Sequence, residues 1–226
     1  RKHKVPLSSS FHTNFHAYGK HYGFGLINGM VLKYLRTIHN KTAATFAPSD
    51  DLLQTLNQTG FENLHLLGRG VDTELFNPNK RDCALRAQWG VSEDQPVAVY
   101  VGRVAKEKNI NLTIQAYQTM QATIPDLKMV IVGDGPERIH LQKTHPEIHF
   151  SGMRRDDDLA RHYASGDLFL FGSTTETFGN VVTEAMASGL LVMAFDYAAP
   201  QRYITANIDG VLVPYADEAA FIEQAT

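Results

Sequence analysis

The sequence predicts an α/β protein built on a doubly wound parallel sheet. The clearest sign is a set of short, continuously apolar segments, each the length of one strand: residues 97–101, 129–132 and 168–171. Such strands are buried on both faces, as in parallel sheets that carry helices on each side. Segments with the spacing of amphipathic helices alternate with them, and this alternation is typical of a doubly wound fold.

The first part of the chain is predicted to contain strands and helices in alternation. Residues 24–40 place apolar side chains at intervals of three and four, which indicates one face of a helix. A helix over residues 52–59 follows Ser49 and Asp50, either of which can cap it, and Gly60 ends it. The predicted strands are residues 5–10, 43–48 and 64–67.

From residue 80 onward the alternation becomes regular. The turn Asn77-Pro78-Asn79 is the best candidate for a linker, so we predict one domain over residues 1–78 and a second over residues 79–226. The predicted elements of the second domain are strands 96–101, 128–132, 148–150, 167–171, 190–194 and 211–213, and helices 110–122, 136–143, 156–164, 181–188 and 218–225.

Length, charge and composition exclude several classes of protein. A chain of 226 residues with 43% hydrophobic residues is ordinary for a folded protein, and a net charge of -3 gives no reason to expect a nucleic-acid partner. Cys83 is the only cysteine, and a lone thiol fits the cytoplasm. No stretch approaches the roughly 18 apolar residues of a membrane span. The chain begins beside its first strand and stops inside its last helix, as a fragment would.

The end of the strand at residues 96–101 is basic. Gly102 and Arg103 follow this strand directly, and Lys108 comes five residues after Arg103. Ligands of parallel sheets bind at the carboxyl ends of the strands, where an Arg and a Lys together can hold a phosphate. A basic surface loop explains the same residues equally well.

A tight turn, Gly133-Asp134-Gly135-Pro136, follows the strand at residues 128–132. The glycines let a ligand or a loop approach the backbone closely, and proline suits the first position of a helix. Most turns of this kind only connect a strand to a helix. The turn is not a Gly-x-Gly-x-x-Gly dinucleotide fingerprint, and the chain contains no Walker phosphate loop.

Two carboxylates, Glu176 and Glu184, flank Phe178-Gly179 after the strand at residues 167–171. Because a helical pattern begins directly after Gly179, one segment combines a glycine turn, a helix N-terminus and two acceptor side chains. The helix end attracts an anion, and carboxylates accept hydrogen bonds from sugar hydroxyls. For this pair alone, a capped helix with a solvated glutamate is the simpler interpretation.

Together these motifs resemble family 4 of the retaining glycosyltransferases, in the family's order and over nearly the whole chain. Within the family, the similarity is greatest to bacterial mannosyl- and glucosyltransferases that act on lipid acceptors, including GDP-mannose-dependent α-mannosyltransferases. The segments that carry the resemblance are Ser10-Phe11-His12-Thr13, Ala47-Pro48-Ser49, Gly70-Val71-Asp72-x-x-x-Phe76-x-Pro78, Gly102-Arg103 with Lys108, Gly133-Asp134-Gly135-Pro136, and Glu176-Thr-Phe-Gly-Asn-x-x-x-Glu184-Ala-Met-Ala-x-Gly189.

The resemblance implies a GT-B architecture, in which two Rossmann-like domains face each other. Residues 1–78 would be the incomplete end of the acceptor domain with its hinge. Residues 79–226 would be the domain that binds the nucleotide sugar, with a truncated last helix.

The resemblance also implies roles for individual residues. Arg103 and Lys108 would neutralise the donor diphosphate, and Glu184 would accept hydrogen bonds from the ribose. Glu176 would hold the transferred sugar, and His12 would lie near its reacting carbon. The other donor-binding residues implied are Gly102, Gly133, Gly135, Met153, Phe178, Gly179, Asn180 and Val181.

The implied reaction moves a hexose, mannose or glucose, from a nucleotide diphosphate sugar to a hydroxyl of a lipid or glycan acceptor, without a metal or another cofactor. We prefer a positioning role for Glu176 over a nucleophilic one. His12 is a candidate general base, with a loop histidine bonded to backbone as the alternative. Two other functions fit the same residues: a nucleotide-sugar epimerase of GT-B shape, and a donor-binding remnant without transfer activity.

The predicted helix over residues 24–40 has features of a helix that contacts a membrane surface. Lys33 and Arg36 flank the apolar stripe of this predicted helix, so it could lie on the inner face of a membrane. Packing against the domain core is the favoured explanation, because surface helices bury such a stripe in any case.

Overall fold

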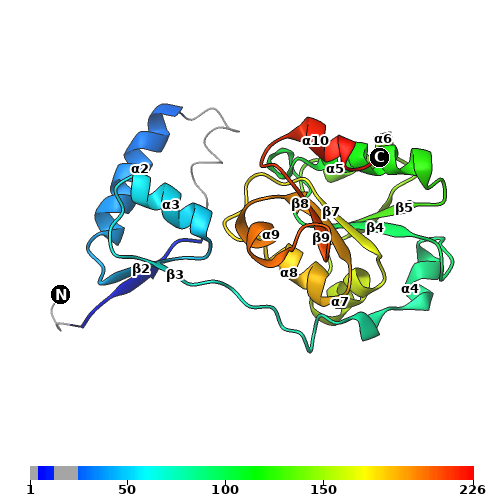
Figure 1. Cartoon of the computed structure of the whole chain (residues 1–226), viewed down its shortest axis with the longest axis horizontal. Helices are drawn as coiled ribbons and strands as arrows, with labels where there is room; N and C mark the ends of the chain where they lie inside the picture. The colour runs from blue at the N-terminus through cyan, green and yellow to red at the C-terminus, as the bar shows by residue number, and fades with distance from the viewer. Residues whose placement is uncertain (1–4, 13–24) are drawn as a thin grey trace. The chain divides into compact units, whose positions relative to one another are not determined.

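The computed structural model describes residues 5–12 and 25–226 of the chain. The chain forms two compact units, drawn in Figure 1: the first comprises Arg1–Arg69 and Thr175–Phe178, and the second comprises Gly70–Thr174 and Gly179–Thr226. Both units are α/β and every paired strand is parallel, which confirms the predicted fold class. The chain enters the second unit at Gly70, upstream of the turn Asn77-Pro78-Asn79.

The first unit contains a three-stranded parallel sheet in the order β1-β2-β3. Ser49 caps the second of its helices, because the backbone N–H of Leu52 donates to the Ser49 hydroxyl at 3.4 Å. Residues 5–7, predicted as strand, lie outside the sheet, and Pro6 has no N–H to donate to a neighbouring strand. The elements are β1 Ser8–Ser10, α2 Gly25–His39, β2 Ala44–Ala47, α3 Asp50–Gln58 and β3 Leu64–Leu66.

A small hydrophobic core holds the first unit together. Leu32 and Leu35 of α2 pack against it, whereas Met30 and Tyr34 of the same helix are 68% and 66% exposed. The predicted apolar stripe of residues 24–40 is therefore not wholly a packing face. None of the helices in the described part of the chain is long and apolar enough to cross a membrane. The buried core residues are Phe11, Ala47, Leu52, Leu56 and Phe61.

The second unit contains a six-stranded parallel sheet in the order β6-β5-β4-β7-β8-β9. This is the strand order of dinucleotide-binding folds, and it reverses between β4 and β7. Helices α5, α6 and α10 lie on one side of the sheet, and α7 and α8 lie on the other (Figure 1). The strands are β4 Val97–Val101, β5 Lys128–Val132, β6 His149–Gly152, β7 Leu168–Phe171, β8 Leu191–Phe195 and β9 Gly210–Val213. The helices are η1 Pro78–Lys80, α4 Cys83–Gln88, η2 Lys106–Lys108, α5 Ile110–Thr123, α6 Arg138–Thr144, α7 Asp156–Ala164, α8 Asn180–Ala187, α9 Ala198–Tyr203 and α10 Glu218–Glu223.

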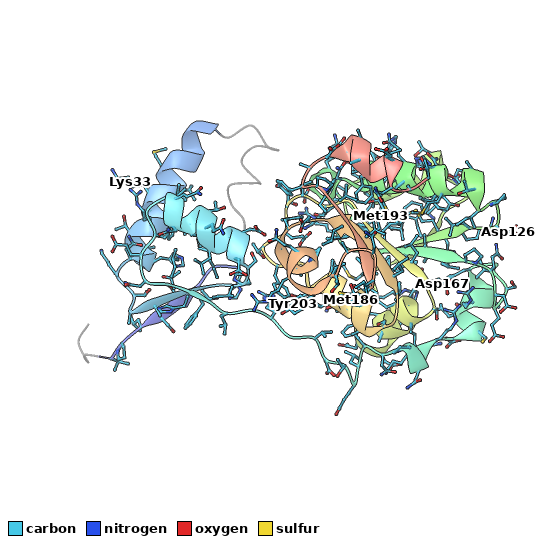
Figure 2. The ribbon with its side chains drawn as sticks, viewed as in Figure 1. Lys33, Asp126, Asp167, Met186, Met193 and Tyr203 are labelled. Atoms are coloured by element: carbon cyan, nitrogen blue, oxygen red, sulfur yellow. The ribbon has the colours of Figure 1, made fainter. Side chains whose placement is uncertain are left out.

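The core of this unit lies on both faces of the sheet. All five residues of β4 are buried, and so is Met193 of β8 (Figure 2). The charged side chain of Arg86 on α4 is buried as well: it donates to the carbonyl of Ser165 at 2.6 Å and approaches the carboxylate of Asp167 at 3.4 Å. Since the same carboxylate accepts from the backbone N–H of Val97 at 2.9 Å, this ion pair ties α4 to the starts of two central strands.

A cluster of aromatic rings beside α7 contains Trp89, the only tryptophan of the chain. Its ring centroid lies 5.6 Å from that of His162 and 6.4 Å from that of His149. Burial lowers the pKa of both imidazoles below the ordinary value, because a charged ring would lose its hydration there.

These lowered pKa values predict a loss of stability in acid. Since the folded state resists protonation of both rings, their contribution is complete above the unfolded pKa of about 6.5 and is lost as the pH falls from there through the folded values. We expect His162→Gln to flatten this loss, measured by urea unfolding with Trp89 fluorescence at several pH values. The exposed His140 supplies the control, His140→Gln, which should keep the wild-type profile. The same profile in His162→Gln would contradict the explanation.

Candidate functional site

A cavity of about 420 Å³ opens at the carboxyl ends of β4 and β5 in the second unit. Four of the residues predicted for the site, Gly102, Arg103, Gly133 and Met153, line it together. This is the edge of a doubly wound sheet at which ligands bind. The remaining lining residues are Val101, Val132, Asp134, Arg154 and Leu159.

Glycines at the strand ends let the loops around the cavity meet backbone to backbone. A Cβ atom on Gly133 would lie 1.9 Å from the carbonyl oxygen of Gly102, and one on Gly135 would lie 2.3 Å from that of Val104. The Gly133 N–H donates to the carbonyl of Gly152, at the end of β6, at 2.9 Å. The turn at residues 133–136 thus builds the cavity wall, whether or not a ligand also contacts its backbone.

Arg103 is exposed but anchored. Its side chain is 53% exposed and donates from Nη1 to the carboxylate of Glu107 at 2.9 Å, while Glu107 itself is 1% exposed in η2. The hydroxyl of Tyr100 donates to the Arg103 carbonyl at 3.0 Å. Lys108 ends η2, so both predicted cations belong to the one loop that joins β4 to α5.

The N-terminus of α8 has the features of an anion site. Gly179 precedes it with φ +93, and no side chain caps the helix. The Oδ1 atom of Asn180 is buried and has no hydrogen-bond partner among the described residues. A helix start with open N–H groups and an unsatisfied acceptor suits a ligand that carries both a negative charge and hydrogen-bond donors.

Glu184 lies one turn further along α8 and is half-buried. The hydroxyl of Tyr163 donates to its Oε2 atom at 2.9 Å. Burial raises the pKa of Glu184, and the hydrogen bond from Tyr163 opposes that rise because it stabilises the charged carboxylate.

Three of the predicted site residues, His12, Glu176 and Phe178, belong to the first unit. Arg103, Lys108 and Glu184 belong to the second. Within the first unit, the hydroxyl of Thr177 donates to the His12 carbonyl at 3.3 Å, so Glu176 and His12 lie near each other along this contact. The His12 ring accepts from Arg69 at 2.7 Å rather than from backbone. The roles of all these residues stay predictions.

The cavity also contains residues that the sequence did not single out. Arg154 lines the wall and donates to the Ser151 carbonyl at 3.0 Å and to the carboxylate of Asp158 at 3.1 Å. Its position directly after β6 is a usable signal, because the other site residues also follow strand ends. Tyr163, which contacts Glu184 and is not among the residues that line the cavity, gives no such signal, since a tyrosine within a helix is more often only a core residue.

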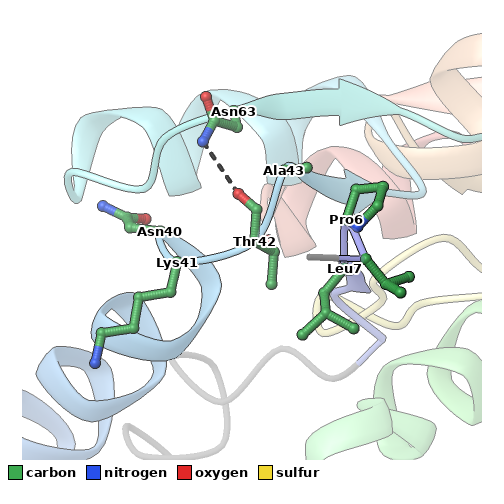
Figure 3. A pocket seen from close by; sticks show the side chains of 8 residues that line it. Pro6, Leu7, Asn40, Lys41, Thr42, Ala43 and Asn63 are labelled. Carbon is green, nitrogen blue, oxygen red and sulfur yellow. Dashed lines mark hydrogen bonds between the residues drawn. The ribbon is translucent and has the colours of Figure 1, made fainter. Parts of the chain in front are cut away.

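A larger cavity, of about 510 Å³, lies in the first unit, where the chain enters its strands (Figure 3). It is lined by residues 5–7 and 40–43 and by Asn63, whose Nδ2 donates to the Thr42 carbonyl at 3.3 Å. This is the amino edge of the sheet, opposite the edge at which parallel sheets bind ligands, so the smaller cavity is the better candidate. Among residues 5–12 and 25–226, no three His, Cys, Asp or Glu side chains are grouped to hold a metal ion.

The strand order, the cavity and the helix N-terminus are features typical of nucleotide-binding α/β proteins. Comparison with known proteins is more specific. Residues 83–226 match the family Glycosyl transferases group 1, and residues 1–75 match Glycosyltransferase Family 4. The chain therefore belongs to the family 4 glycosyltransferases, and the predicted resemblance is confirmed.

Individual relatives agree with this family. The chain is 34% identical to a GDP-mannose-dependent alpha-mannosyltransferase of Mycobacterium tuberculosis, covering 96% of this chain and 56% of that protein. It is 25% identical to the alpha-monoglucosyldiacylglycerol synthase of Acholeplasma laidlawii, covering 87% and 54%. Among solved structures, HepE of Anabaena in complex with UDP and glucose superposes with a TM-score of 0.78 at 22% identity, covering 98% and 61%, and supports the GT-B fold. The chain spans about half the length of the curated relatives it matches.

Proposed function

We propose that the protein transfers a hexose from a nucleoside diphosphate sugar to an acceptor hydroxyl with retention. The observation that carries this proposal is the convergence, at one sheet edge, of the 420 Å³ cavity with Arg103, the uncapped start of α8 and the half-buried Glu184. A nucleoside diphosphate sugar offers a base for a cavity, a diphosphate for cations and a helix end, and ribose hydroxyls for a carboxylate.

The chemistry follows from the charges. Breaking the sugar–phosphate bond leaves an oxocarbenium-like sugar and a diphosphate that gains negative charge. Arg103 and Lys108, with the N–H groups at the start of α8, stabilise this leaving group from fixed positions. Glu176 positions the sugar, and His12 is the candidate base for the acceptor hydroxyl.

The donor we propose is GDP-mannose. Three relatives named GDP-mannose-dependent alpha-mannosyltransferases, at 34%, 35% and 31% identity, support this choice. A UDP-sugar is the competing donor, because HepE was solved with UDP and glucose. Calorimetry distinguishes the two donors when binding is measured for GDP-mannose, UDP-glucose, GDP and UDP.

The acceptor we propose is a lipid or glycan hydroxyl at a membrane surface. The name of the diacylglycerol-linked relative supports a lipid. The apolar residues Met30 and Tyr34 are exposed one turn apart on α2, and the neighbouring Lys33 points outward (Figure 2). An apolar stripe with basic neighbours favours peripheral contact with an anionic membrane face.

The decisive experiment measures donor binding and sugar transfer on the same sample. Transfer to a lipid extract with loss of donor supports the proposal. Conversion of donor without any acceptor, followed by NMR of the sugar, would instead indicate an epimerase. Binding without either reaction would indicate a donor-binding remnant.

Glu184→Gln tests the site directly. Removing the charge from an acceptor of ribose hydroxyls should weaken binding of GDP roughly 10- to 100-fold, since a hydrogen bond to a charged group contributes about 1.5–3 kcal/mol. Calorimetry gives the affinity, and Glu223→Gln on the exposed face of α10 removes an equal charge as the control. Unchanged affinity for both GDP and UDP would show that the site is wrongly assigned.

A further inference from the structure

A fully buried hydroxyl contacts the carboxylate to which we assign ribose binding. Tyr163, near the end of α7, has 0% exposure, and its hydroxyl donates to Glu184 Oε2 at 2.9 Å. The two residues come from neighbouring helices, α7 and α8, which pack against each other. The Oε1 atom of Glu184 takes no part in this bond.

The tyrosine ring is itself fixed from two sides. The ring of Phe76 meets it edge-on with centroids 5.7 Å apart, and the ring of Phe169 on β7 lies at 5.9 Å. A tyrosine side chain has only two rotatable bonds, so this packing leaves its hydroxyl one position. The Tyr163 hydroxyl that donates the hydrogen bond is therefore held rigidly, whereas the glutamate that accepts this bond has a longer and more flexible side chain.

We propose that Tyr163 is a positioning residue for donor binding, whose hydroxyl holds one oxygen of Glu184 and leaves the other for the ribose. The inference rests on the proposed function of Glu184. A carboxylate held in place before the ligand arrives loses less conformational freedom on binding, which strengthens the hydrogen bond to the ribose hydroxyls. The same bond favours the charged, accepting form of the half-buried carboxylate over the protonated one.

A purely structural role makes a different prediction. Buried tyrosine hydroxyls need a partner in any protein, so Tyr163 could merely use Glu184 to satisfy its own hydroxyl. In that case, removal of the Tyr163 hydroxyl would change the stability of the protein, and any effect on ligand binding would not depend on the ribose hydroxyls. A ligand that lacks the ribose hydroxyls therefore distinguishes the two roles.

The test compares Tyr163→Phe with Tyr117→Phe. Tyr117 on α5 is also fully buried, and its hydroxyl approaches the Leu127 carbonyl at 3.5 Å, away from the site. Calorimetry is run with GDP, UDP and their 2′,3′-dideoxy analogues. We expect Tyr163→Phe to weaken binding of the ribonucleotide roughly tenfold and to leave the dideoxy analogue unchanged. Tyr117→Phe should change neither.

A double-mutant cycle provides a second measurement, with the folded fraction of each variant checked by thermal unfolding. If Tyr163 acts through Glu184, Tyr163→Phe adds no further loss of affinity to Glu184→Gln. If Tyr163→Phe weakens binding of a ribonucleotide and of its dideoxy analogue equally, or weakens neither, the inference is overturned. If Glu184→Gln alone leaves GDP and UDP binding unchanged, the proposed function of Glu184 is contradicted. This result differs from the results that contradict only the role of Tyr163, so the two proposals can be told apart.

The pH dependence of GDP binding is a further measurement, and a purely structural role of Tyr163 would leave it unchanged. Glu184 faces the hydroxyl of Tyr163, and Tyr163 in turn lies near Tyr100 of β4. Removing the Tyr163 hydroxyl removes a bond that stabilises the carboxylate, so the pKa of Glu184 rises further. The acid loss of GDP affinity should therefore begin at a higher pH in Tyr163→Phe than in wild type. A loss at the same pH in both would count against the inference.

Discussion

Replacing Arg103 by alanine is expected to slow sugar transfer by about 10²- to 10³-fold, the usual effect of removing one fixed group that stabilises developing charge. The diphosphate gains negative charge as the sugar leaves, and Arg103 lies on the rim of the cavity proposed to hold the nucleotide. Lys108→Ala should act in the same direction. The measurement is kcat/KM for the donor, with Lys106→Ala, an exposed cation of the same helical turn, as the control.

Arg103→Ala also affects the stability of the protein, and this effect must be separated from the effect on transfer. Glu107 is almost fully buried and pairs with Arg103, so Arg103→Ala takes a cation from a buried carboxylate and destabilises the fold. The double variant Arg103→Ala/Glu107→Gln restores neutrality at that position. We expect it to recover stability without recovering transfer. A double variant that transfers sugar at the wild-type rate would refute a direct role for Arg103.

Gly133→Ala is expected to lower the free energy of unfolding by roughly 3 kcal/mol, the sum of a steric clash and backbone strain. The new Cβ would lie 1.9 Å from the carbonyl oxygen of Gly102, and the residue has φ +140. Urea unfolding measures the loss.

Gly90→Ala separates the two causes of that loss. Gly90 has φ +73 but no atom within 4 Å of its added Cβ, so strain alone should cost about 1 kcal/mol. Equal losses at the two glycines would mean that the loops around the cavity separate easily. The cavity would then be a weaker candidate for a preformed site.

The fold was largely predictable because a parallel sheet leaves a strong local signal. The apolar runs of β4 and β5 identify strands that are buried on both faces, and the acidic start of α7 marks its N-terminus. Two short α-helices, α4 and α9, were missed. Six-residue α4 is too short to show a period, and Pro200 interrupts the pattern of α9.

The candidate site was predictable only where topology places it. Gly102 and Arg103 follow β4, Gly133 follows β5 and Met153 follows β6. Parallel strands bring their carboxyl ends to one edge, so these residues meet in the cavity. The hydrogen bond from Tyr163 to Glu184 was not predictable, because it depends on the packing of α7 against α8. No local pattern specifies such a contact.

The pairing of the central strand has a consequence for how the chain folds. β4 pairs with β5 on one side and with β7 on the other, and Val97 is joined to Asp167 across a separation of 70 residues. Three α-helices (α5, α6 and α7) and two strands (β5 and β6) lie between β4 and β7, so this half of the sheet closes only when segments far apart in the sequence meet. During synthesis, the edge of β4 that pairs with β7 stays unpaired until β7 has left the ribosome, so we expect the second unit to complete its sheet late in synthesis.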